Sequence, residues 1–128
     1  MAFEAAQIKV GQFTASADLS GKQYHFVKMS GNNTVTVCAA ITDVPIGVLQ
    51  NTPTSGQAAE VCLFGITKVV ADGTLAAGNV LGTSADGQAD AIVAGTDTTV
   101  YTMGIALNAA SAGETVEAFI NATAGRAA

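Results

Sequence analysis

Short runs of apolar and β-branched residues alternate with turn-forming residues along the chain, and this pattern predicts strands throughout. The longest stretch without Gly or Pro runs from Asn32 to Val44 and carries Thr-Val-Thr-Val at its centre, which leaves little room for long helices. Strands are predicted over Gln12–Ala17, Tyr24–Met29, Thr34–Ala39, Ile46–Gln50, Ala59–Phe64, Thr67–Val70, Val80–Thr83, Ala89–Val93, Val100–Leu107 and Thr115–Ile120. Such spacing is typical of a small β-barrel or β-sandwich, so we expect a compact all-β fold of mostly antiparallel hairpins.

Clusters of Gly, Asn and Asp mark the tightest turns of this predicted fold. They lie at Ser30–Asn33, Asp72-Gly73 and Ala85–Gly87. Gly and Asn adopt positive φ at low cost, as two-residue hairpin turns require, so these clusters are expected to join neighbouring strands.

An internal repeat divides the chain into two similar halves. A shift of 57 residues places Ile46–Phe64 on Met103–Asn121 without a gap, and four of the nineteen aligned positions are identical. The identities include two glycine pairs that we expect at equivalent turn or backbone positions, Gly47 with Gly104 and Gly56 with Gly113. We interpret the repeat as a duplicated β unit within one domain. The alternative is that Gly-rich β sequence resembles itself by composition.

This interpretation divides residues 1–128 into four parts of a single domain. They are an extended N-terminal arm over 1–11, a first β unit over 12–64, a second β unit over 65–121 and a C-terminal tail over 122–128.

Size and composition fit one domain whose core is built from small and branched apolar residues. The chain has 128 residues, of which 49% are hydrophobic and 5% aromatic, with no Trp. Only 12% of residues are charged, and the mean hydropathy is +0.40, so the surface must be unusually neutral. No stretch is apolar enough for a transmembrane helix, and the first residues lack the features of a signal peptide. We therefore expect synthesis in the cytoplasm and no membrane partner.

The two cysteines, Cys38 and Cys62, lie outside any C-x-x-C or Cys/His pattern. In a reducing compartment this predicts two buried, reduced thiols. A disulfide between them is the alternative.

Charge is acidic overall and unevenly distributed. The net charge of −5 argues against a nucleic-acid partner, which would require clustered Lys and Arg. Residues 1–68 are balanced, with Lys9, Lys22, Lys28 and Lys68 against Glu4, Asp18, Asp43 and Glu60. Residues 69–125 carry no basic residue and six acids, Asp72, Asp86, Asp90, Asp97, Glu114 and Glu117. The two halves are therefore expected to face different surroundings, although a purely solubilising acidic face would give the same pattern.

No catalytic, cofactor-binding or metal-binding residues are predicted. His25 is the single histidine and is interpreted as a solvated strand residue. Gly73–Gly78 imitates the spacing of a phosphate-binding loop, but Asn79-Val80 follows where Lys and Ser or Thr are required. Asp86 and Asp90 lack the spacing of a calcium loop, and Glu114 and Glu117 would project to opposite faces of a strand. The sequence therefore gives no support for an enzyme.

Several segments, taken in order, resemble the capsid cement or head decoration proteins of tailed bacteriophages. They are Asp18–Lys28, Pro45–Pro53, Gly65–Val69, Ala77–Leu81, Gly104–Ala106 and Ala112–Val116. Gln57 and Asn79 depart from the pattern, at positions where the family commonly has acidic residues. The resemblance implies a non-enzymatic structural protein without cofactors. It would bind the major capsid protein on the outer surface of the virion head and stabilise contacts between its subunits, commonly as a homotrimer.

For the capsid contact itself, the candidates are Phe3, Ile8 and Val10 in the N-terminal arm, together with the charge-balanced half. Acids packed against the capsid would have to be desolvated, so the acidic half is expected to face solvent. A frayed N-terminal tail is the alternative for the arm. The alternative function is a virion or cell-surface β-sandwich module that binds glycans, which the lack of Trp disfavours.

Overall fold

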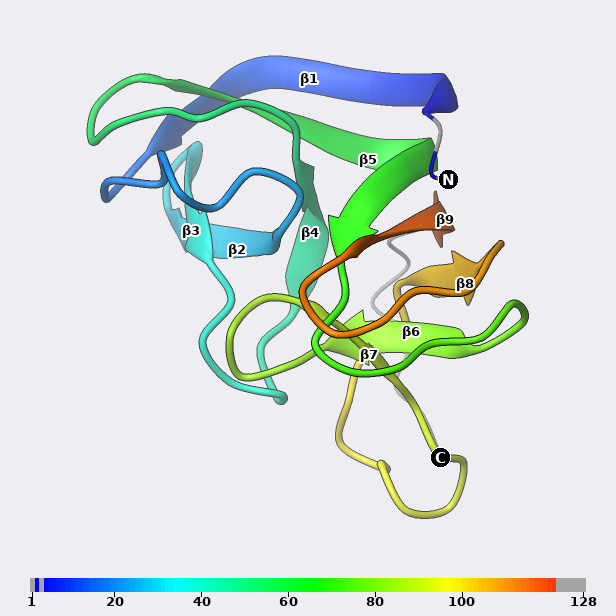
Figure 1. Ribbon diagram of the computed structural model, residues 1–128. Coiled ribbons are helices and arrows are strands. Elements are labelled where there is room, and N and C mark those ends of the chain that lie inside the picture. The colour runs from blue at the N-terminus through cyan, green and yellow to red at the C-terminus, as the bar shows by residue number, and fades with distance from the viewer. Residues whose placement is uncertain (1, 3, 122–128) are drawn as a thin grey trace.

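The computed structural model describes residues 2 and 4–121, and these residues form an all-β fold without helices (Figure 1). Nine strands pair mostly antiparallel, as the sequence predicts. Their bounds are β1 Ala5–Ala15, β2 Phe26–Gly31, β3 Thr34–Val37, β4 Pro45–Leu49, β5 Ala58–Val70, β6 Val80–Thr83, β7 Ala89–Ala91, β8 Gly104–Ala106 and β9 Thr115–Asn121. No helix in the described part of the chain has the length and apolarity needed to cross a membrane.

The strands form two rings that share β5. The first ring follows the order β1-β3-β2-β4-β5, and pairing of β1 with β5 closes it. The second ring follows β5-β9-β8-β6-β7, and a bridge between Ala71 and Ala89 brings β7 back beside the end of β5. In Figure 1, β5 follows β1 across the top of the molecule and then bends down into the second ring.

The two rings are built alike, which confirms the predicted pair of similar halves. Pairing of Val48 with Cys62 in the first ring recurs as pairing of Ile105 with Phe119 in the second, at the predicted shift of 57 residues. The hairpin partners Val27 and Val37 recur as Leu81 and Ala91, which gives a shift of 54 residues. The second unit is therefore three residues longer between its β6–β7 hairpin and β8 than the first unit is between its β2–β3 hairpin and β4.

The repeat glycines hold equivalent places in the two rings. A Cβ on Gly47 would collide with the carbonyl oxygen of Cys62, and a Cβ on Gly104 would collide with that of Phe119. Gly56 and Gly113 have φ of +85° and +84° in the loops that precede β5 and β9. All four glycines thus meet matching backbone constraints in the two rings.

Each ring has its own core, and the two cores use different faces of the same strands. The first-ring core consists of Phe13, Ala15, Leu19, Val27, Val35, Leu49, Ala59 and Val61. The larger second core combines Val69, Leu75, Leu81, Met103, Ala106, Val116, Ala118 and Ile120 with Phe26, Cys38 and Val48 from the first ring. Because side chains alternate along a strand, β2 and β4 point Val27 and Leu49 inward and Phe26 and Val48 toward the second ring.

Three sequence predictions need correction in their bounds. β1 begins at Ala5 rather than Gln12, because residues 5–14 pair with β5. The strands predicted over 59–64 and 67–70 are the single strand β5, in which Gly65 adopts a φ of +123° without ending the ladder. The strand predicted over 100–107 is restricted to Gly104–Ala106.

His25 is not the solvated strand residue that the sequence predicts. Its side chain is only 6% exposed, and the residue lies just before β2. Its Nδ1 is 3.1 Å from the carbonyl oxygen of Gln23, and its Nε2 is 3.5 Å from Nε2 of Gln88 in the second half. Packing between the rings therefore buries a residue that alternation alone places at the surface.

Candidate docking surface

The N-terminal candidates for capsid contact do not share one environment in the structure. Residues 5–11 form no free arm, because they belong to β1, which pairs with β5. Ile8 is 58% exposed, whereas Val10 is partly buried against the first-ring core. Residues two apart on a regular strand point to the same face. Ile8 and Val10 do not, because the pairing of β1 with β5 is irregular on both sides of Ile8. Phe3 lies outside the described residues, as does the predicted tail over 122–128.

Ile8 is one end of an apolar surface that crosses five strands, which we call the outer stripe. Neighbouring members are paired across the ladders: Ile8 with Phe64, Ile66 with Phe119, Phe119 with Ile105, and Ile105 with Val80. The Phe64 and Phe119 rings meet edge to face with their centroids 5.3 Å apart. Four of the six side chains, Ile8, Phe64, Val80 and Ile105, are at least 40% exposed. The stripe is therefore an ordered but largely uncovered apolar face.

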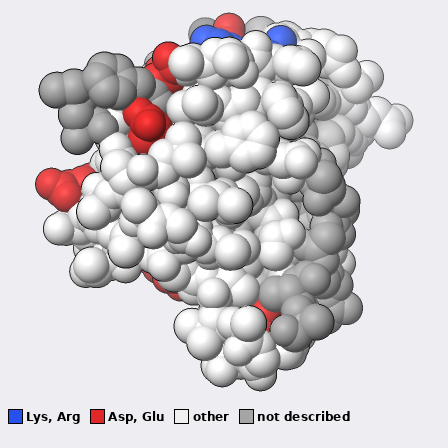
Figure 2. All heavy atoms as spheres, turned by 90° about the vertical axis from the view of Figure 1, so that its right-hand side faces the viewer, with Lys and Arg blue, Asp and Glu red and all other residues white. Residues whose placement is uncertain are grey.

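The stripe borders a shallow groove and has few charges around it. A groove of about 310 Å³ is lined by Val80, Thr102, Gly104, Ile105, Phe119 and Asn121, none of which is charged. Figure 2 views the side of the molecule where β8 and β9 end and shows a mostly uncharged described surface, with the charged atoms mainly at its margins. A partner would therefore lose little charge solvation on docking here.

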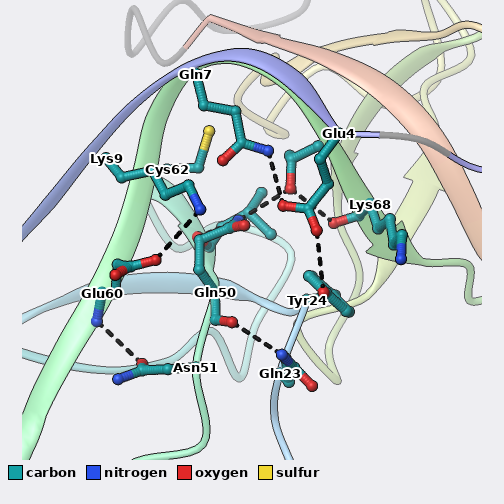
Figure 3. Close-up of polar contacts among 12 residues, drawn as sticks. Glu4, Gln7, Lys9, Gln23, Tyr24, Gln50, Asn51, Glu60, Cys62 and Lys68 are labelled. Carbon is teal, nitrogen blue, oxygen red and sulfur yellow. Dashed lines mark hydrogen bonds and ion pairs between the residues drawn. The ribbon is translucent and has the colours of Figure 1, made fainter.

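Polar side chains fasten the start of β1 beside the stripe (Figure 3). The carboxylate of Glu4 accepts hydrogen bonds from Gln7 Nε2 at 2.8 Å and from the Tyr24 hydroxyl at 3.1 Å. Gln7 Nε2 also donates to the carbonyl oxygen of Ile66 at 2.8 Å. Burial, with a smaller contribution from Glu4, raises the pKa of Tyr24. These contacts hold the exposed Ile8 on a fixed strand.

A buried amide lies beneath this polar group. Gln50 is 7% exposed, and its Nε2 donates to Thr67 Oγ1 at 2.9 Å and to the Val48 carbonyl at 3.1 Å. The Gln50 backbone carbonyl oxygen accepts from Gln23 Nε2 at 2.9 Å. These hydrogen bonds join β4, β5 and the loop before β2, and they leave the buried Gln50 Oε1 without a partner among the described residues.

The two thiols are free and buried, as predicted. Burial raises the pKa of Cys38 to about 12, with a further contribution from Asp43. Burial also raises the pKa of Cys62. A thiol with a raised pKa is a poor nucleophile, so neither cysteine is suited to covalent chemistry.

Two acids of the second half accept hydrogen bonds from nearby backbone amides. Asp97 Oδ2 accepts from the Val93 amide at 2.7 Å, and Asp90 Oδ1 accepts from the Ala91 amide at 3.0 Å. Within residues 2 and 4–121, no group of three or more His, Cys, Asp or Glu side chains is placed to hold a metal ion.

The sequence predicts only Ile8 of the outer stripe. A local signal for part of the rest is present in strands with apolar residues on both faces, such as Ile105-Ala106 and Phe119-Ile120. In each pair, the second residue is buried in the core and the first points outward. A strand with apolar residues on both faces indicates that its outer face is covered as well as its inner face. Only the strand order, however, shows that the outward residues of the stripe lie next to one another.

Comparison with protein-family models finds no match, and comparison with curated proteins also finds none. Among solved structures, the chain is similar to one described as the head fiber gp8.5 N base in bacteriophage phi29. The alignment has a TM-score of 0.67 and 21% sequence identity, and it covers 91% of this chain and 95% of that chain. The similarity shows that the two chains share a fold along nearly their whole lengths.

Proposed function

We propose that this protein is a non-enzymatic structural component of a tailed-phage head that binds the outer capsid surface and stabilises contacts between major capsid protein subunits. The observation that carries the proposal is the fold match, which covers 91% of this chain and 95% of a chain described as the base of a head fiber. The ordered resemblance of the sequence to capsid cement proteins supports the same assignment.

The surface chemistry supports a protein that works by adding interface. Only 12% of the residues are charged, and the outer stripe presents apolar side chains from five strands. Binding many copies to a capsid adds buried area at many sites, which stabilises the shell without chemical turnover. We propose that the protein binds as a homo-oligomer, with a trimer favoured by the resemblance.

For the orientation on the capsid, we propose that the charge-balanced half and β1 provide most of the contact. Ile8 is the exposed large apolar residue of β1, and the ion pair of Lys9 with Glu60 at 3.4 Å lies next to it. Desolvating this neutral face costs less than desolvating the acidic half.

The experiment is co-sedimentation of the purified protein with empty, expanded heads of the phage that encodes it. Saturable binding is expected, together with a higher temperature at which the heads disrupt. Ile8→Ser should weaken binding by about fivefold or more, because it removes most of the apolar area of an exposed contact. The matched control is Val93→Ser, since Val93 is similarly exposed at 57% and lies in the loop after β7.

Failure of the wild-type protein to bind heads would overturn the function. The orientation is tested separately by replacing Asp86, Asp90 and Asp97 with Asn, which should leave binding unchanged. If the Asn variant loses binding while Ile8→Ser binds normally, the acidic half faces the capsid. Deleting residues 1–10 would not test the arm, because the deletion would also remove half of β1 and its pairing with β5.

A further inference from the structure

One three-residue surface occurs twice in this molecule, once covered and once open. In the first ring, Phe26 pairs with Val48, and Val48 pairs with Cys62. In the second ring, Val80 pairs with Ile105, and Ile105 pairs with Phe119. The duplication makes these triplets structurally equivalent, and both lie on the outward side of their rings.

The two triplets differ sharply in burial. Phe26, Val48 and Cys62 are each 0% exposed. Phe26 and Val48 belong to the same core cluster as Leu81, Ala106 and other second-ring side chains. The outer face of the first ring is therefore covered by a β unit of the same fold.

The same face of the second ring has no such cover within the described chain. Val80 is 40% exposed and Ile105 is 43% exposed, and Phe119 is only partly buried. In repeat proteins, a terminal unit that ends in water carries a polar outer face. Here the second ring carries apolar residues on a face that no described part of the chain covers.

The size and charge of this face fit a protein partner that resembles the chain itself. With Ile66 and Phe64 alongside, the triplet exposes on the order of 300 Å² of apolar side chain, the size at which an exposed apolar patch is often an interaction site. Among the described residues, none that lines the groove at Val80, Ile105 and Phe119 is charged. Two copies of a chain with net charge −5 could therefore meet here without placing their acids in contact.

We propose that the face formed by Val80, Ile105 and Phe119 is the surface through which one copy of this chain binds a second copy. The neighbouring copy would cover this face, as the second ring covers the equivalent face of the first. This inference rests on the proposed function, because it assigns a contact surface to the homo-oligomer proposed there. It leaves Ile8, at the other end of the stripe, for the capsid.

The test uses the isolated full-length protein, without heads, so that it is independent of capsid binding. Sedimentation equilibrium or size-exclusion chromatography with light scattering should show an oligomer in the micromolar range. Val80→Lys and Ile105→Lys should each weaken self-association at least tenfold. Val44→Lys is the matched control, because Val44 is 43% exposed and lies outside the stripe. Far-UV circular dichroism and thermal melting establish that each variant is folded.

A second measurement does not depend on introducing a charge. In an Ile105→Cys variant, the new thiol should react with a maleimide at least tenfold more slowly at high protein concentration than at low concentration. The native thiols of Cys38 and Cys62 are buried and give little background. The inference is overturned by a wild-type protein that stays monomeric at about 100 µM, well above the dissociation constant of a micromolar complex. Lys variants that associate normally, or labelling independent of concentration, would overturn it as well.

Discussion

Gly47 and Gly104 lie where the backbones of neighbouring strands approach too closely for a side chain to fit. We predict that Gly47→Ala or Gly104→Ala lowers the free energy of unfolding by about 1–3 kcal/mol or more, because the new methyl group must displace a strand carbonyl. Urea denaturation measures the change. Gly21→Ala is the control, since a Cβ at Gly21 would meet no atom within 4 Å beyond its chain neighbours. Equal stability of the Gly104→Ala variant and the wild type would contradict the close approach.

Cys38 and Cys62 give a second prediction at the scale of the residue. Burial and the raised pKa values should make both thiols react with a bulky thiol reagent at least a hundredfold more slowly in the native protein than in urea. Mass spectrometry of the intact protein should give the mass of the fully reduced chain. Rapid native labelling would show that the strands around these thiols open readily.

His25 predicts a dependence of stability on pH. Burial is the main cause that lowers its pKa, Lys22 lowers it further, and the Gln23 carbonyl and Asp86 oppose the shift. In the unfolded chain, His25 takes up a proton near pH 6.5, while the folded protein resists protonation until a lower pH. The free energy of unfolding should therefore fall as the pH drops below about 6.5.

The measurement is urea denaturation at pH 7.5, 6.5 and 5.5, with His25→Gln as the comparison. The variant should lose most of the pH dependence in this range. The lowered pKa values of Asp18 and Asp43 affect stability only at more acidic pH, since the loss begins below the unfolded value of 3.8. An identical slope in the variant and the wild type would assign the effect to another group.

At the scale of the element, the loops before β5 and β9 are matched in their hydrogen bonds. Asn51 Oδ1 accepts from the Glu60 amide at 3.0 Å, and Asn108 Oδ1 accepts from the Glu117 amide at the same distance. We predict that Asn51→Ala and Asn108→Ala each reduce stability by about 1 kcal/mol, because each leaves a backbone amide without its side-chain acceptor. Thermal or urea unfolding provides the measurement, with Thr52→Ala as the exposed control in the first loop. A cost in one loop alone would show that the halves have diverged energetically.

Strands with a strong local pattern are predicted well from the sequence, and strands defined by distant pairing are not. The alternation in Thr34–Val37 and the run Val80–Thr83 give elements close to those observed. β1 extends to Ala5 only because β5 offers it an edge, and no local feature of the mixed polar and apolar residues at 5–11 indicates this. Gly65 has the character of a strand break, yet it allows β5 to pass close to the backbone of Ala6. The outer stripe could not be predicted from the sequence for the same reason. Only the strand order brings Ile8 close to residues as distant in sequence as Phe119.

At the scale of the whole molecule, the shared strand makes the two rings interdependent. β5 supplies residues to both cores, and Phe26 and Val48 complete the second core from the first ring. We predict that the full chain unfolds in one cooperative transition and that a fragment of residues 58–128 does not fold alone. Calorimetry and circular dichroism measure the two outcomes. A cooperative transition in the fragment, or two separate transitions in the full chain, would show that the rings are independent.

The arrangement around the middle of β5 has a consequence for how the protein can be re-engineered. Ala5 at the start of β1 pairs with Ile66, and Asn121 at the end of β9 pairs with Phe64, so the two outer strands reach β5 within two residues of each other (Figure 1). A short peptide could join these positions, and new ends could then be opened in the exposed loop at 94–96. The fold is thus suited to circular permutation, which would place a fused cargo on the loop between β7 and β8.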